Sequence, residues 1–286
     1  MEIENKTIFV SAYVTSINNN RKISEYIDYG KKMLDIDICQ VVFIEKHIFD
    51  EHLKDYIVSD VTSDFFTYSV DGTLKTFEYT IYKNKVFVFF NRDDIYLYNY
   101  KDDITEFNVE TNNHSKDTID YMFVQCHKTE WVKMAILLTR QINKTIDNSN
   151  IHFLWIDYGI YHMIRNEDVF KNELEGLVTR SNTNHKEIKS IRIAGCWDVN
   201  LVYNNMNIDT DIYKRITWYF AGSMFGGNEM ALIEFADKMR TKSIKIIKER
   251  KTLMWEINVW YLIFLENRDM FNSYMCNHDT SIISNY

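Results

Sequence analysis

The sequence contains no proline and only eight glycines in 286 residues. Without proline, tight turns have to be made by glycine, asparagine and aspartate, so the positions of the few glycines are informative. Cysteine is also scarce, and no two of the four cysteines have the spacing of a metal site or a redox motif. This pattern favours reduced thiols in a cytoplasmic protein over a disulfide framework. The cysteines are Cys39, Cys126, Cys196 and Cys276.

Long hydrophobic runs are missing as well. The longest fully apolar run, Val259 to Leu265, is far shorter than the about 20 residues that cross a bilayer. The first residues, MEIENKTIF, have no basic segment followed by an apolar one, so they do not resemble a signal peptide. We therefore expect no transmembrane segment and a cytoplasmic location.

Basic residues are in deficit, with 33 lysines and arginines against 41 aspartates and glutamates. The resulting net charge of -8 argues against a general nucleic-acid binder, which would carry a basic face. It does not exclude a single nucleotide, because one local basic group or a metal ion suffices to bind it. Hydrophobic residues make up 46% of the chain, which is typical of a folded protein.

Strand and helix patterns alternate at the start of the chain. Thr7 to Val14 is rich in β-branched and aromatic residues and predicts a buried strand. Arg21 to Asp35 places its apolar residues near one helical face, and Cys39 to Lys46 is another short apolar run. Strand, helix and strand at this spacing predict a βαβ unit, and hence a partly parallel sheet in an α/β fold.

Strand and helix patterns continue along the rest of the chain. Asn228 lies where the N-cap of a long helix is expected. No repeat, Ser/Gly linker or change of composition divides the chain, so we expect one domain over residues 1–286. The expected elements are a hairpin from Thr76–Ile81 and Lys85–Phe90, a polar loop Asn91–Asp117, helices Trp131–Ile142, Glu229–Arg250 and Leu253–Leu265, and strands Ile151–Asp157 and Lys189–Trp197.

Asp157 ends the apolar run IHFLWID and is followed by Gly159. In open α/β sheets, ligands bind at the carboxyl ends of the strands. A carboxylate at such an end suits a divalent cation, and a glycine beside it lets a phosphate approach the backbone. A turn cap explains this residue equally well when it is considered alone.

A literal DxD motif is present elsewhere, at Asp209-Thr210-Asp211. The residues on both sides of it are polar, and no buried strand is there to position it. We interpret this motif as a solvated loop or the start of a helix.

Three of the eight glycines, Gly222, Gly226 and Gly227, fall within the segment AGSMFGGN just before a predicted helix. Glycine there permits a tight turn and a close backbone approach, and a helix N-terminus favours anions. The segment matches neither the Walker A pattern nor the Rossmann spacing, so a simple tight loop into the helix is the alternative.

Three polar side chains remain as candidates for chemistry. Glu256 shares a helical face with apolar residues, where a carboxylate is paired, has a raised pKa or lines a cavity. Lys128, just before a helix, suits a phosphate contact or is a solvated lysine. His278, near the end of the chain, is a candidate ligand, although a lone histidine is more often a hydrogen-bonded surface residue.

Several long segments together resemble the HtrL/YibB family, bacterial and viral proteins associated with lipopolysaccharide or surface-glycan synthesis. The resemblance spans the chain and is strongest from Lys128 onward. That family in turn resembles nucleotide-sugar glycosyltransferases of the GT-A type. The resemblance therefore implies a single GT-A-like domain with a mixed, mainly parallel sheet flanked by helices, in the cytoplasm of a bacterium or of a host cell. The segments are FVSAYVTS, VVFIE, HKTEWV, FLWIDYGI, WYFAGSMFGGNEMALIEFADKM, MWEINVWYLIFLEN and CNHDTSII.

The resemblance also implies roles for individual residues. Asp157 takes the place of the usual DxD motif, with Trp155 where the first aspartate would be. Asp157 and His278 would hold a divalent metal, Mn²⁺ or Mg²⁺, which binds the diphosphate of the donor. Residues implied to bind the donor are Ser11, Ala12, Tyr13, Arg21, Lys128, Gly159, Gly222, Gly226 and Gly227.

The implied reaction transfers a sugar from a nucleotide-sugar donor, expected to be UDP-linked, to a hydroxyl of a glycan or glycoconjugate. Metal and lysine would neutralise the departing diphosphate, and Glu256 would deprotonate the hydroxyl or stabilise the sugar cation. Contact with a lipid-borne acceptor would be peripheral. A metal-dependent phosphohydrolase and a non-catalytic, glycan-binding descendant of a transferase are the competing hypotheses.

Overall fold

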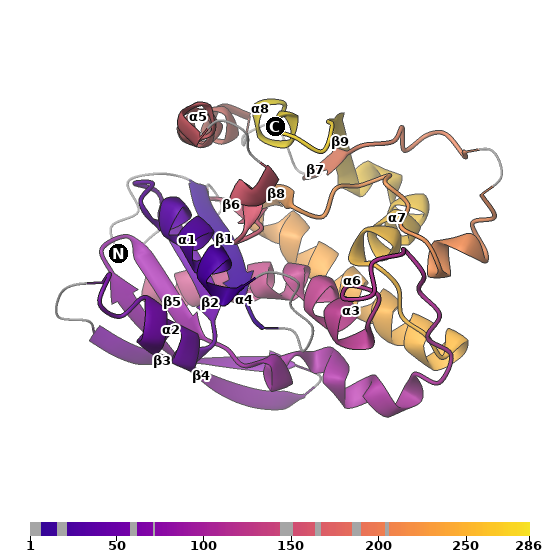
Figure 1. Cartoon of the computed structure of the whole chain (residues 1–286), viewed down its shortest axis with the longest axis horizontal. Helices are drawn as coiled ribbons and strands as arrows, with labels where there is room; N and C mark the ends of the chain where they lie inside the picture. The colour runs from indigo at the N-terminus through magenta and orange to yellow at the C-terminus, as the bar shows by residue number, and fades with distance from the viewer. Residues whose placement is uncertain are drawn as a thin grey trace.

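The computed structural model describes residues 7–15, 22–57, 62–70, 72–143, 151–163, 167–184, 190–203 and 206–286. The strands of this part of the chain form one nine-stranded sheet in the order β3-β4-β5-β2-β1-β6-β8-β7-β9 (Figure 1). They are β1 (Thr7–Tyr13), β2 (Cys39–Ile44), β3 (Thr62–Val70), β4 (Thr73–Tyr82), β5 (Lys85–Phe89), β6 (His152–Ile156), β7 (Ile191–Gly195), β8 (Met224–Asn228) and β9 (Phe271–Met275).

Helices cover both faces of the sheet (Figure 1). In β1, Ile8 and Val10 pack in the hydrophobic cluster that contains Trp131, whereas Phe9 packs with Met33 on the opposite face, because successive strand residues point to opposite sides. The helices are α1 (Ile23–Leu34), α2 (Lys46–His52), α3 (Ile119–Cys126), α4 (Lys128–Ile142), α5 (Glu167–Asn184), α6 (Glu229–Arg250), α7 (Glu256–Glu266) and α8 (Ser281–Ser284).

The sheet is mixed, which confirms an α/β fold, but it is not mainly parallel. Four of its neighbouring pairs are parallel (β1–β2, β1–β6, β2–β5 and β7–β9) and four are antiparallel (β3–β4, β4–β5, β6–β8 and β7–β8). The prediction of a mainly parallel sheet is therefore wrong. The antiparallel pairs come from the meander β3–β4–β5 and from β8, which lies between β6 and β7.

Most predicted elements are present. The βαβ unit of β1, α1 and β2, the β4–β5 hairpin and helix α6 are confirmed, and the Asn228 side chain accepts a hydrogen bond from the amide of Ala231 as an N-cap. Helix α7 begins at Glu256 rather than at Leu253. The segment 91–117 is not only a polar loop, because it contains the 3-10 helices Arg92–Asp94 and Tyr96–Asp103.

Gly226 and Gly227 lie in strand β8, so the prediction that they belong to a tight turn before the helix is wrong. Gly226 pairs with Leu154 of β6 and Gly227 pairs with Phe153. A Cβ on Gly226 would meet the Tyr286 hydroxyl and lie 2.8 Å from the carbonyl oxygen of Phe153. These glycines permit close packing inside the sheet rather than a turn.

Replacing Gly226 by alanine is expected to lower the free energy of unfolding by about 1–3 kcal/mol, because the added methyl group overpacks the sheet against a fixed backbone carbonyl. Chemical denaturation of the purified variant measures this change. Gly176→Ala in helix α5 is the matched control, since its Cβ would meet only the flexible end of Arg180. An unfolding free energy of Gly226→Ala equal to that of the control would contradict this packing.

In the described part of the chain, none of the helices has the length and apolar character needed to cross a membrane.

Candidate functional site

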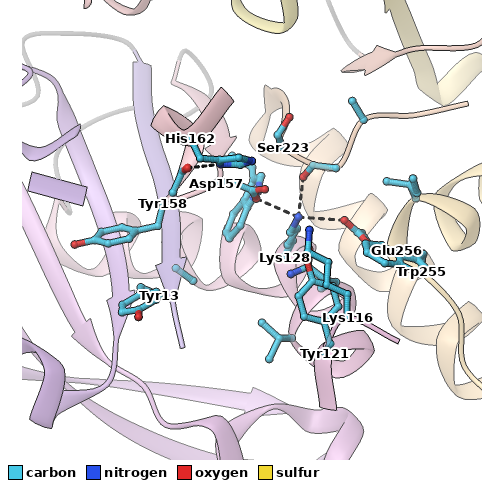
Figure 2. A pocket seen from close by; sticks show the side chains of 18 of the residues that line it. Tyr13, Lys116, Tyr121, Lys128, Asp157, Tyr158, His162, Ser223, Trp255 and Glu256 are labelled. Atoms are coloured by element: carbon cyan, nitrogen blue, oxygen red, sulfur yellow. Dashed lines mark hydrogen bonds and ion pairs between the residues drawn. The ribbon is translucent and has the colours of Figure 1, made fainter. Parts of the chain in front are cut away.

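A cavity of about 340 Å³ opens where strands β1 and β6 end (Figure 2). Tyr13 is the last residue of β1, and Asp157 directly follows β6. Both line the cavity, together with residues from α1, α3, α4, α7 and the segment before β8.

The strand order explains why a cavity forms here. From β1 the chain moves through α1 to β2 on one side, whereas β6 pairs with β1 on its other side. The connections therefore diverge between β1 and β6. In α/β sheets, this point beyond the carboxyl ends of the strands is where ligands bind.

Lys128 lies at the centre of the site, as the first residue of α4. Its ammonium group is 3.1 Å from Asp157 Oδ1 and 3.1 Å from Glu256 Oε1, and it donates a hydrogen bond to the carbonyl oxygen of Gly222 at 2.9 Å (Figure 2). An ammonium has three donors, and these three acceptors use all of them. Lys128 therefore fixes the two carboxylates relative to each other.

The protonation of Lys128 follows from the same contacts. Burial lowers its pKa, but the nearby carboxylates Asp157 and Glu256 raise it more, so the pKa lies above the ordinary lysine value. Because the folded-state pKa exceeds the unfolded one, the contribution of the ammonium to stability is fully present below the unfolded-state pKa. It is lost only as the pH rises through the folded-state value. Lys128 is therefore charged at neutral pH.

Asp157 is held by the strand that precedes it and by the segment before β8. Its amide donates to the carbonyl oxygen of Ser223 at 3.0 Å, and the indole Nε1 of Trp155 donates to Asp157 Oδ1 at 2.9 Å. Trp155 and Asp157 are two residues apart on an extended chain, which places their side chains on the same side. The contacts of this carboxylate with Trp155 and Lys128 both use Oδ1, and the group, with 31% of its side chain exposed, lines the cavity.

Glu256 is the first residue of α7 and is only 2% exposed. A Cβ on Gly222 would collide with its Oε1 and lie 3.2 Å from its Cδ, so glycine is needed where this carboxylate packs. Lys128 binds Oε1, whereas Oε2 is buried and has no hydrogen-bond partner among the described residues. Burying a carboxylate oxygen without a hydrogen-bond donor raises the free energy of the folded state, unless a ligand or water supplies the donor.

Three tyrosines form one end of the cavity. The ring of Tyr13 stacks between those of Tyr26 and Tyr158, with centroid separations of 5.2 Å and 5.4 Å. Burial raises the pKa of both Tyr13 and Tyr158, so both hydroxyls are protonated donors at neutral pH. Figure 2 shows Tyr13 and Tyr158 on the opposite side of Asp157 from Glu256.

Tryptophans form much of the remaining wall. Trp131 stacks on Trp155 at a centroid separation of 5.9 Å, and Trp218 and Trp255 lie elsewhere on the lining. Five of the lining residues carry a buried polar atom that lacks a hydrogen-bond partner within the described residues: Tyr13 Oη, Trp131 Nε1, Tyr158 Oη, Trp255 Nε1 and Glu256 Oε2. Buried polar groups are normally paired with protein or ordered water, so these five atoms are candidates for contact with water or a polar ligand.

His278 also lines the cavity and packs edge-on against Trp218, with centroids 5.8 Å apart. No group of three His, Cys, Asp or Glu side chains suited to a metal is found in the described ranges. A divalent ion at Asp157 would thus take most of its ligands from phosphate and water oxygens, as Mg²⁺ commonly does.

The neighbours of Lys128 in HKTEWV have other roles. Burial lowers the pKa of His127 well below its ordinary value, so this ring is neutral. Glu130 forms a buried ion pair with Arg240 and accepts a hydrogen bond from Tyr68, away from the cavity. These contacts fix the start of α4. Lys128 is the residue of this segment that contacts both Asp157 and Glu256.

The structure brings most of the predicted site residues together. Ser11 is buried in β1 and is not part of the lining, Gly226 and Gly227 lie in β8, and Arg21 is outside the described residues. The predicted residues that line the cavity are Ala12, Tyr13, Lys128, Asp157, Gly159, Gly222, Glu256 and His278.

Sequence reasoning missed part of the lining. Trp155 and Tyr158 had a usable signal, since they flank Asp157 at the end of an apolar strand. Lys116, Trp218 and Trp255 lie in separate segments whose sequences do not indicate that they meet at one cavity.

Comparison with known proteins identifies no family for this chain. The sequence matches no protein-family model, and it matches no curated protein sequence.

Proposed function

We propose that the chain is a nucleotide-sugar-dependent glycosyltransferase with a single GT-A-like domain, related to the HtrL/YibB family. The observation that carries this proposal is the Asp157–Lys128–Glu256 cluster in a cavity at the carboxyl ends of β1 and β6. Two carboxylates and unpaired polar groups beside stacked tyrosines suit a ligand with a base, a diphosphate and a sugar.

In this proposal the tyrosine end of the cavity receives the nucleotide base. The carboxyl end of β1 supplies Ala12 and Tyr13, and Gly159 lies at the start of the turn after Asp157. The faces of Tyr13 and Tyr158 are occupied by stacking on each other. The Tyr158 hydroxyl packs against Gly30 of α1, so Tyr13, at the end of β1, is the tyrosine of this pair that we assign to the base.

The diphosphate would lie against Asp157, where a divalent ion held by Asp157 and His278 would supply positive charge to the leaving group. Lys128 has a different role from the expected phosphate contact, because all three of its donors already have protein acceptors. It orients Asp157 toward the ligand, a task that it shares with Trp155. Gly222 lets the carboxylate of Glu256 pack against the same lysine.

We assign to Glu256 the interaction with the transferred sugar or with the attacking hydroxyl, because Glu256 lines the cavity and its Oε2 has no hydrogen-bond partner among the described residues. A buried carboxylate oxygen without a donor can accept the proton of a hydroxyl or stabilise positive charge on the sugar carbon. Trp255, directly before Glu256, lines this end of the cavity, and its indole Nε1 has no hydrogen-bond partner in the part of the chain that the structure describes.

Thermal denaturation with a panel of nucleoside diphosphates, each with and without Mn²⁺, tests the proposal. We expect at least one nucleotide to raise the melting temperature, because a ligand at 100 times its Kd stabilises the folded state by about 2.7 kcal/mol. Inorganic pyrophosphate with Mn²⁺ is the control for binding of the diphosphate alone. If no nucleotide exceeds this control, or if p-nitrophenyl phosphate is hydrolysed rapidly without an acceptor, the transferase proposal is wrong.

A further inference from the structure

Two cysteines that are far apart in sequence meet beside the cavity. Strands β7 and β9 are parallel neighbours, with Gly195 paired to Met275. The residue directly after each strand is a cysteine, and the amide of Cys276 donates to the carbonyl oxygen of Gly195 at 2.9 Å. The sulfur atoms of Cys196 and Cys276 lie 4.0 Å apart, although 80 positions separate them along the chain.

The four thiols of the chain differ in environment. Cys39 and Cys126 are 3% and 1% exposed, and the Cys126 thiol donates to the carbonyl oxygen of Met254. Cys276 is buried, whereas Cys196 is partly exposed. A reagent in solution therefore reaches Cys196 first, and the nearest sulfur to Cys196 is that of Cys276.

The backbone at this point is compatible with a cross-link. Gly195 and Met275, the paired residues just before the two cysteines, lie on neighbouring strands about 5 Å apart, a separation within the range that disulfides bridge. The two sulfurs already contact each other, so rotation of the side chains is enough to bring them to bonding distance without moving the strands.

We propose that Cys196 and Cys276 form a reversible thiol–disulfide exchange site that reacts with low-molecular-weight disulfides. The Cys196 thiolate attacks one sulfur of the reagent, whose S–S bond breaks and releases one thiolate. The Cys276 thiolate then attacks Cys196 in the mixed disulfide and releases the second thiolate. Two protein thiols are oxidised, the reagent is reduced to two thiols, and the two protein protons pass to the released thiolates.

The exchange site borders the cavity on two segments. His278, two residues after Cys276, lines the cavity, and the amide of Trp197, directly after Cys196, donates to the carbonyl oxygen of Trp218 at 2.7 Å. The disulfide would join the segments that lead to Trp218 and His278. The proposal rests on the geometry of the two thiols and stands whether or not the chain is a transferase.

Incubation of the folded protein with oxidised glutathione, followed by alkylation of free thiols and peptide mapping, tests the proposal. We expect a wild-type species lighter by two hydrogen atoms, in which the peptides of Cys196 and Cys276 are joined and Cys39 and Cys126 are alkylated only after unfolding. Dithiothreitol should restore four free thiols.

Cys276→Ser should retain glutathione on Cys196, because the second attack is removed, and Cys126→Ser is the matched control that should still form the cross-link. Mapping of the wild-type protein decides the outcome even if a variant fails to fold. Wild-type protein that carries glutathione on Cys196 without the internal bond, that does not react, or that joins other cysteines would overturn the proposal.

Discussion

Replacing Lys128 by methionine should lower the free energy of unfolding by about 3–5 kcal/mol, the usual cost of leaving buried charge without its partner. The side chain of Lys128 is 4% exposed, and it is the cation shared by Asp157 and Glu256. Methionine fills much of the same volume but leaves the two carboxylates facing each other. Urea denaturation monitored by circular dichroism measures the loss.

Two comparisons isolate the cause of this loss. Lys133→Met removes another lysine of α4, whose partner Asp237 is 51% exposed, and should cost less than about 1 kcal/mol. Adding Glu256→Gln to Lys128→Met should recover part of the stability, because it removes one of the unpaired charges. An effect of Lys128→Met as small as that of Lys133→Met would show that the cluster is not held by this ion pair.

Asp157→Asn should leave the fold nearly unchanged but reduce sugar transfer by about 10²–10³-fold, the range seen when one stabilising electrostatic contact in an active site is removed. Asparagine keeps an oxygen that can accept from both Trp155 and Lys128, and this side chain is partly exposed. The negative charge, which the proposed diphosphate and metal site needs, is lost. Initial rates of transfer with the nucleotide sugar that matches the best-binding nucleotide measure the effect, and a melting curve confirms folding.

Asp209→Asn is the matched control for this substitution. Asp209 belongs to the literal DxD motif, yet it is exposed and does not line the cavity. It should therefore retain full activity. Two results would show that Asp157 has no direct role in sugar transfer: activity of Asp157→Asn equal to that of Asp209→Asn, or a loss of activity equal to its loss of folded protein. A non-catalytic binding protein would then be the better hypothesis.

The parts of the fold that depend on local pattern were predictable from sequence. The apolar β-branched runs of β1 and β2, the amphipathic α1 between them and the N-cap at Asn228 each carry their own signal. Strand β8 was missed because its sequence, MFGGN, contains two glycines, which are typical of turns. Its insertion between β6 and β7 is a tertiary effect, and it adds two antiparallel pairs to those of the β3–β4–β5 meander.

The candidate site was predictable in its centre and not at its edges. Asp157 and Glu256 stood out because each is a carboxylate beside apolar sequence, where an unpaired charge is costly. That both acids share Lys128 depends on a distance across the fold, since Glu256 is 128 positions from the lysine. The pairing of Cys196 with Cys276 likewise follows from the register of two strands, which rules on sequence spacing do not describe.

The tryptophans of the cavity wall have a practical consequence. Four of the six tryptophans of the chain, Trp131, Trp155, Trp218 and Trp255, line the cavity. Indole fluorescence responds to the polarity and the stacking of its surroundings, so a ligand that enters should change most of the emission of the protein. Titrations can then follow occupancy of the cavity without a label, whichever ligand is added.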